Sequence, residues 1–200
     1  MRNKGDVKNR VRKTLNRSDV TDEDLDAFID LGLRRCNRLI RNSGMETVVV
    51  KRPASASNFI LIPDDFLKVR ALRVDGKPLT PCSVDEFYAT TSREGDCNHY
   101  TREAEKLLIS GAAPGGSTIL LSYLAAYEAL PEDTSSNRLI AVAPDALMYA
   151  ALVDAGVFFE HEDTDRWEAR LMTTIGELQD LEDDLQADMG VQQVLPLSIE

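Results

Sequence analysis

Hydrophobic spacing changes twice along the 200-residue chain, and these two changes constrain its fold more than any other feature. In residues 1–44 and 128–188, apolar side chains recur every three or four positions, as on one face of a helix. Residues 45–127 instead carry short β-branched and aliphatic runs separated by Pro and Gly. We therefore predict an α+β protein. Residues 1–44 and 128–188 form an α-helical bundle, residues 45–127 form a small inserted antiparallel β-domain, and residues 189–200 form an extended C-terminal tail.

Two helices are predicted in the first block. Val7, Val11 and Leu15 stand four positions apart among basic residues, which predicts a short basic amphipathic helix. Thr21 is suited to an N-cap, and the acidic residues after it favour the positive end of a helix dipole. The second helix is therefore expected over residues 22–42.

Short strands and tight turns are predicted in the middle block. The dipeptide Asp75-Gly76 favours a turn, and the Gly/Pro-rich residues 111–116 are typical of a hairpin connection. A short helix is expected over residues 84–91. The expected strands cover residues 48–51, 59–62, 69–74, 100–103, 106–110 and 117–127.

Two further helices are predicted in the last block. Pro144 suits the first turn of a buried helix. The next helix opens near Asp163-Thr164, and its apolar residues from Trp167 to Leu185 follow a heptad-like spacing. Its other face carries carboxylates that could meet solvent or a neighbouring subunit: Glu177, Asp180, Asp183 and Asp184. Gly190 is expected to end this helix.

The predicted tail carries apolar side chains without a helical or strand period: Val191, Val194, Leu195, Leu197 and Ile199. Such a segment is usually ordered when another chain binds it, for instance in a groove or at a sheet edge. The sequence leaves three alternatives open, namely docking on another chain, folding back on its own domain, and fraying.

Charge is unevenly distributed along a chain whose formal net charge is −11. Residues 1–44 contain eleven Lys or Arg against seven Asp or Glu, whereas residues 128–188 contain three against sixteen. A basic arm, an acidic helix facing a partner, or contacts between opposite ends of neighbouring copies would each produce this asymmetry.

Membrane and secreted classes are not indicated. No apolar run reaches the roughly 18 residues of a membrane span, and the charged start lacks the apolar core of a signal peptide, so we expect synthesis in the cytoplasm. The three cysteines are widely spaced without a CxxC pair, which favours free thiols.

Each candidate for catalytic chemistry lacks a partner that the chemistry needs. Residues 111–118 have the spacing of a phosphate loop but lack its lysine. His161 has no second histidine four positions away. Cys82, Cys97 and His99 would supply only three ligands for zinc. We therefore expect no enzymatic activity, no metal site and no cofactor.

Basic side chains on the first helix are candidates for contact with DNA or with a neighbouring subunit: Lys8, Arg10, Arg12 and Lys13. Lysine and arginine bind phosphates without sequence preference, and that binding weakens steeply with salt. Aromatic residues for base stacking do not interleave with them, and a solvated helix face is the alternative.

Several strings together resemble the head-to-tail adaptor (connector, or tail tubular) proteins of tailed bacteriophages. The resemblance spans roughly residues 21–185, and it depends on the arrangement of the strings because none is diagnostic alone. The strings are Thr21–Leu25, Ile62–Phe66, Val69–Leu79, Leu107–Gly115 with Leu120–Tyr123, and Pro144–Leu152 with Trp167 beyond.

This resemblance implies a structural virion protein at the head-tail junction. The implied assembly is a ring of twelve copies that joins the portal protein to a tail or nozzle protein, with DNA passing through its channel and no membrane contact. Family members often engage the portal through a C-terminal extension, which corresponds here to the tail from Val191 to Ile199. The alternative function is a DNA-contacting accessory assembly factor that uses the basic first helix.

Overall fold

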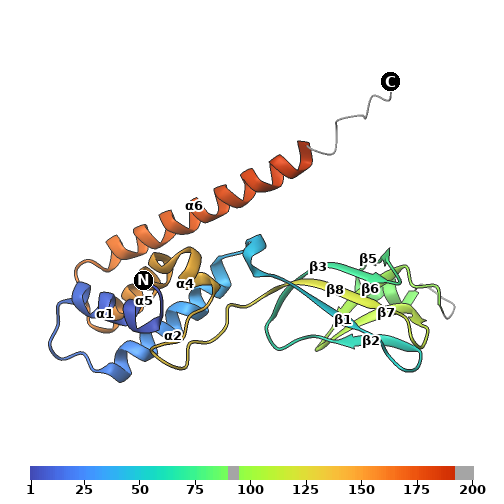
Figure 1. Ribbon diagram of the computed structural model, residues 1–200, viewed down its shortest axis with the longest axis horizontal. Helices are drawn as coiled ribbons and strands as arrows, with labels where there is room; N and C mark the ends of the chain where they lie inside the picture. Colours follow the sequence, from blue (N-terminus) through green and yellow to red (C-terminus); the bar gives the residue numbers. More distant parts are fainter. Residues whose placement is uncertain (90–94, 192–200) are drawn as a thin grey trace. The chain divides into compact units, whose positions relative to one another are not determined.

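The structure is a computed structural model that describes residues 1–89 and 95–191, with the side chains of all of these except 182 and 185–191. The chain divides into two compact units. One comprises Met1–Gly44 and Tyr127–Glu200, and the other comprises Met45–Ala126. Helices dominate the first unit and two four-stranded sheets make up the second, which confirms the predicted α+β class (Figure 1).

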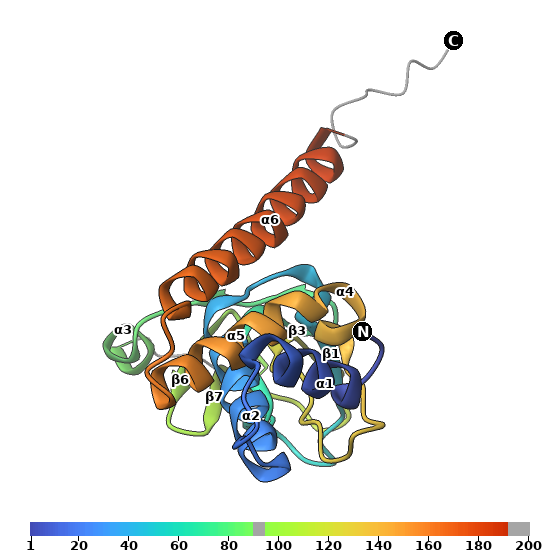
Figure 2. The same cartoon turned by 90° about the vertical axis from the view of Figure 1, so that its left-hand side faces the viewer.

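The helical unit is organised around α5, which packs against every other helix of the unit (Figure 2). Its residues from Ala146 to Leu152 are almost all buried, because neighbouring helices cover it on several sides. Pro144 occupies its first turn, as predicted. The helices are α1 (Lys4–Leu15), α2 (Asp22–Leu39), α4 (Arg138–Val142), α5 (Pro144–Phe158) and α6 (Thr164–Val191).

Local sequence signals explain where α2 starts and ends. The Thr21 hydroxyl accepts a hydrogen bond from the Asp24 backbone N–H at 3.1 Å, and the Asp24 carboxylate accepts one from the Thr21 backbone N–H at 3.0 Å. This reciprocal capping box confirms the predicted N-cap. The helix ends at Leu39 rather than at the expected residue 42, because Ile40 adopts an extended conformation and is buried.

The end of α6 was also predicted too early. The helix continues through Gly190 to Val191, since glycine is an unfavourable helix residue but does not forbid the conformation. Its packed face is formed by Trp167, Leu171 and Ile175, which are buried, whereas Leu181 is 56% exposed. The second half of α6 therefore extends past the other helices of its unit (Figures 1 and 2).

Two lysines of α1 are buried against α2 by a shared carboxylate. The ammonium groups of Lys4 and Lys8 lie 3.0 and 2.9 Å from the Asp26 carboxylate, and Lys8 also lies 3.3 Å from Asp133. Burial alone would raise the pKa of Asp26, but hydrogen bonds from Lys8 and Lys4 hold it below its ordinary value. These ion pairs fix α1 against α2.

Asp26→Asn is expected to lower the free energy of unfolding at pH 7 by about 2 kcal/mol. Losing one partner of a buried pair costs about 3–5 kcal/mol, and the 40% exposure of the Asp26 side chain reduces that cost. Because the folded-state pKa of Asp26 is lowered, its contribution is present above the unfolded pKa of about 4 and is lost as the pH falls through the folded value.

Urea unfolding of both proteins at pH 7 and pH 3 measures this effect, and the difference between them should shrink at pH 3. Asp30→Asn, at an exposed position one turn further along α2, is the matched control and should change little. Equal stability of Asp26→Asn and wild type at pH 7 would contradict the assignment.

In the second unit, two sheets enclose a shared apolar core. The strand orders are β1-β8-β3-β4 and β2-β7-β6-β5. Among the described strands, only β5 and β6 pair in parallel, so the second sheet is mixed, whereas a purely antiparallel domain was predicted. The core includes Leu72, Leu107, Ile109 and Leu121, each at most 1% exposed.

Four of the six predicted strands are longer than expected, the strand expected over residues 59–62 covers 57–61, and the strand expected over residues 117–127 is shortened to 119–125. The short helix expected over residues 84–91 is α3 (Val84–Ala89), and residues 90 and 91 lie outside the described residues. Asp75 and Gly76 both adopt positive φ angles, which confirms the predicted turn between β3 and β4. The strands are β1 (Glu46–Lys51), β2 (Ser57–Leu61), β3 (Phe66–Val74), β4 (Lys77–Pro78), β5 (Thr80–Pro81), β6 (His99–Glu103), β7 (Lys106–Ala113) and β8 (Ile119–Ala125).

Candidate functional site

The basic face predicted on α1 is only partly available for contacts. Lys8 is 6% exposed and donates hydrogen bonds to Asp26 and Asp133, so its ammonium group holds the fold together and is not exposed for a partner. The Arg12 guanidinium pairs with Asp22. Arg10 and Lys13 are exposed, and for these two side chains the expected contact stays a prediction.

Arg10 lies beside two arginines that the sequence did not single out. A depression of about 310 Å³ between α1, α5 and α6 is lined by Arg10, Arg166 and Arg170, together with Tyr149 and Trp167. Three guanidinium groups around one depression create a positive surface suited to carboxylates or phosphates.

The acidic face predicted on α6 is exposed. Glu177, Asp180, Asp183 and Asp184 all face solvent along the second half of the helix. Leu181 lies among them and is also exposed, although a leucine at this spacing would ordinarily pack on a neighbouring helix. The surface thus combines negative charge with an unpacked apolar side chain.

Most of the predicted tail lies outside the described residues. Val194, Leu195, Leu197 and Ile199 fall in residues 192–200, which the structure does not describe, and Val191 is the last residue of α6. Their expected contact with another chain stays a prediction.

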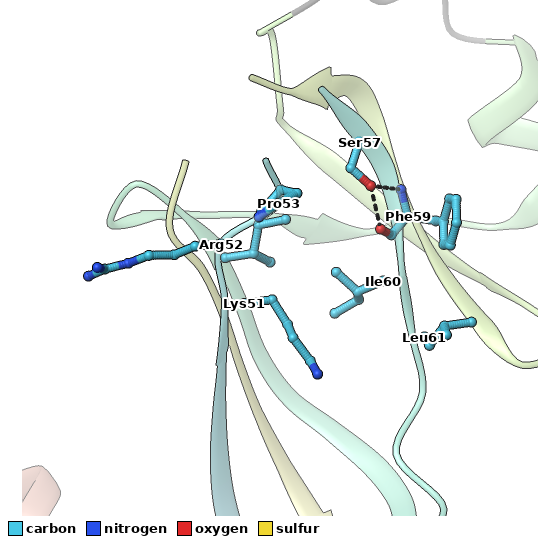
Figure 3. Close-up of a pocket in the computed structure, with 8 residues that line it drawn as sticks. Lys51, Arg52, Pro53, Ser57, Phe59, Ile60 and Leu61 are labelled. Atoms are coloured by element: carbon cyan, nitrogen blue, oxygen red, sulfur yellow. Dashed lines mark hydrogen bonds between the residues drawn. The ribbon is translucent and has the colours of Figure 1, made fainter. Parts of the chain in front are cut away.

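A second depression lies in the sheet unit, where the outermost strands of the two sheets, β1 and β2, face each other. Its volume is about 260 Å³, and it is lined by Lys51, Arg52, Pro53, Ser57, Phe59, Ile60, Leu61 and Ile119. Ile60 points into the space between β1 and β2, whereas Phe59 and Leu61 point to the other side of β2 (Figure 3). The lining combines apolar side chains with Lys51, Arg52 and Ser57, and it contains no carboxylate or histidine that could form an acid-base pair.

His161 and the three cysteines, the side chains considered for metal or catalytic chemistry, lie in surroundings that do not activate them for it. The His161 ring lies 4.5 Å from that of Trp167, and its Nδ1 accepts a hydrogen bond from the Asp163 backbone N–H at 3.1 Å. Burial raises the pKa of the three thiols, that of Cys36 to about 12, so all are protonated at neutral pH. Within residues 1–89 and 95–191, no group of three or more His, Cys, Asp or Glu side chains could hold a metal ion.

Residues 111–118, which have phosphate-loop spacing, join two strands. β7 ends at Ala113 and β8 begins at Ile119, and the Gly116 N–H donates to the Pro53 carbonyl at 2.7 Å. A strand follows the segment instead of the helix of a phosphate cradle, and the Ser117 and Thr118 N–H groups also donate within the chain, to the Pro114 carbonyl and the Asp75 carboxylate. No helix in the described part of the chain is long and apolar enough to cross a membrane.

Two features of these surfaces were missed in the sequence. Arg166 and Arg170 are four positions apart, so the sequence alone indicates that they share one face of α6. Their proximity to Arg10 could not be predicted, because it depends on how α1 packs. Along β2, the exposed Phe59 and Leu61 alternate with the buried Ile60. The sequence indicates that successive side chains point to opposite faces of the strand, but not which of the two faces is exposed.

Comparison with known proteins identifies one family. The sequence model of the SU10 adaptor protein matches residues 2–193, which cover both units. No curated protein matches the sequence significantly.

Proposed function

Because the chain belongs to the SU10 adaptor protein family, we propose that it is a structural virion protein that forms a ring joining the portal to the tail. Membership makes it a phage adaptor protein with a structural rather than a catalytic role. The observation that carries the proposal is the match over nearly the whole chain, since it includes the helical unit, the inserted sheets and α6.

Each part of the chain has a role in this proposal. The helical unit builds the ring, and the ring lines part of the DNA channel. The sheet unit faces the tail protein or the adjacent subunit. The apolar tail, from Val191 to Ile199, binds the portal. Twelve copies is the number that fits the adaptor resemblance.

A ring of identical subunits needs a heterologous contact, in which one surface of each copy meets a different surface of the next. The positive depression lined by Arg10, Arg166 and Arg170 and the acidic second half of α6 are two such different surfaces. Their opposite charges support the ring arrangement.

A DNA-contacting accessory factor is the second candidate, and the exposure of Arg10 and Lys13 favours it. Duplex binding through these side chains should fall steeply with salt and should be lost when both become alanine. Filter retention of labelled duplex at low salt tests it, and absence of retention by the wild type removes this candidate.

Cofractionation with the portal of the same virion tests the adaptor proposal. The purified chain should elute with the portal in a complex much larger than either component. Separate elution of the two proteins at micromolar concentration would contradict the proposal.

A further inference from the structure

The lining of the depression between α1, α5 and α6 carries more positive than negative charge. Asp163 is the one carboxylate in its lining, and it lies 3.8 Å from the Arg166 guanidinium. Among the described residues, neither Arg10 nor Arg170 forms an ion pair. Two guanidinium groups are therefore available to a partner.

Opposite charges lie on one face of α6. Arg166, Arg170, Glu177 and Asp184 follow spacings of four, seven and seven positions, which place them along a single stripe of the helix. The sequence from Leu171 to Val191 contains no Lys or Arg. The first half of the stripe is thus basic and the second half is acidic.

Among the described residues, no ion pair joins these two halves within one copy. Arg170 and Asp184 are fourteen positions apart, which corresponds to about 20 Å along a helix. Leu181, in the acidic half, is 56% exposed. A second copy would supply carboxylates to the depression and guanidinium groups to the acidic half.

We propose that the acidic second half of α6 docks in the arginine-lined depression of a neighbouring copy. Glu177, Asp180 and Asp184 would meet Arg10, Arg166 and Arg170, and Leu181 would face the apolar part of the depression. Arginine suits this role because its planar fork binds carboxylates bidentately. The inference rests on the proposed ring function and names the contact that builds it: each copy gives α6 to one neighbour and receives α6 from the other.

Charge exchange tests this contact. Arg166→Glu with Arg170→Glu should reduce the fraction of protein in rings at least tenfold, and so should Asp180→Lys with Asp184→Lys. Combining the four substitutions in one chain restores opposite charges and should restore assembly. Native mass spectrometry in the presence of the portal gives the ring fraction, and thermal unfolding verifies that each variant is folded.

The matched control is Arg34→Glu with Arg38→Glu, which makes the same charge change at exposed positions of α2 away from the depression. It should assemble as the wild type does. Normal assembly of Arg166→Glu with Arg170→Glu, or failure of the four-substitution chain to regain assembly, overturns the contact.

Two further outcomes separate this inference from neighbouring hypotheses. If the arginine variant keeps its rings but loses duplex retention at low salt, the depression binds phosphates and the subunit contact is wrong. If the wild type forms no ring even with the portal, the proposed function itself fails and the contact fails with it. If the wild type and the arginine variant both form rings, the proposed contact is rejected and the ring function is not.

Discussion

Gly32→Ala is expected to destabilise the protein by about 3 kcal/mol, a large fraction of the stability of a typical domain. A Cβ at position 32 would lie 2.8 Å from the Ala151 backbone nitrogen and 3.1 Å from the Ala150 carbonyl carbon. Both are backbone atoms of α5, so α2 and α5 would have to separate along their whole contact. The melting temperature should fall by about 6–12 °C, which scanning calorimetry measures.

Gly176→Ala is the matched control for this prediction. Gly176 also lies within a helix, but an added Cβ there meets nothing within 4 Å. Alanine should therefore stabilise α6 by about 0.5–1 kcal/mol, because it has the higher helix propensity. A melting temperature of Gly32→Ala equal to that of the wild type would show that the α2–α5 packing is looser than described.

Removing residues 191–200 is expected to abolish portal binding while leaving the helical and sheet units folded. The deleted segment includes four apolar side chains beyond α6, Val194, Leu195, Leu197 and Ile199. Interface affinity usually concentrates in a few apolar anchors, so their loss should weaken binding at least about 100-fold. Titration of the immobilised portal with wild-type and truncated protein measures the change.

Substituting the same four residues by serine at full length is the control for chain length. It should lose portal binding as the deletion does, with an unchanged melting temperature. Wild-type affinity in the deleted chain would remove the tail from the proposed interface and leave the ring proposal to be tested separately.

Local signals in the sequence were sufficient for most elements. The Thr21 capping box set the start of α2, Pro144 set the start of α5, and Asp75-Gly76 set the turn after β3. Each depends on residues close together in the chain, so periodicity and turn chemistry identify it directly.

What the sequence did not reveal depends on contacts between distant segments. Lys8 was grouped with the exposed basic side chains of α1, yet Asp26 and Asp133 bury it. The depression around Arg10 likewise forms only when α6 packs beside α1. The helical period assigns a charged residue to one face of α1, but tertiary packing decides whether that face is solvated.

The short helix α4 and the parallel pairing of β5 with β6 were missed for a related reason. α4 spans only Arg138–Val142, too short for an apolar period to be recognised, and it is stabilised by its Asn137 cap. β5 contains two residues, Thr80 and Pro81, and its direction follows from the chain around it rather than from its own composition.

We propose above all that the chain acts as a ring subunit seated on the portal. Electron microscopy of the wild-type chain mixed with portal rings tests it most directly. We predict a second ring, coaxial with the portal and with α6 of each copy in contact with its neighbour. Single copies bound around the portal without contact to one another, or portal rings without bound protein, would contradict it.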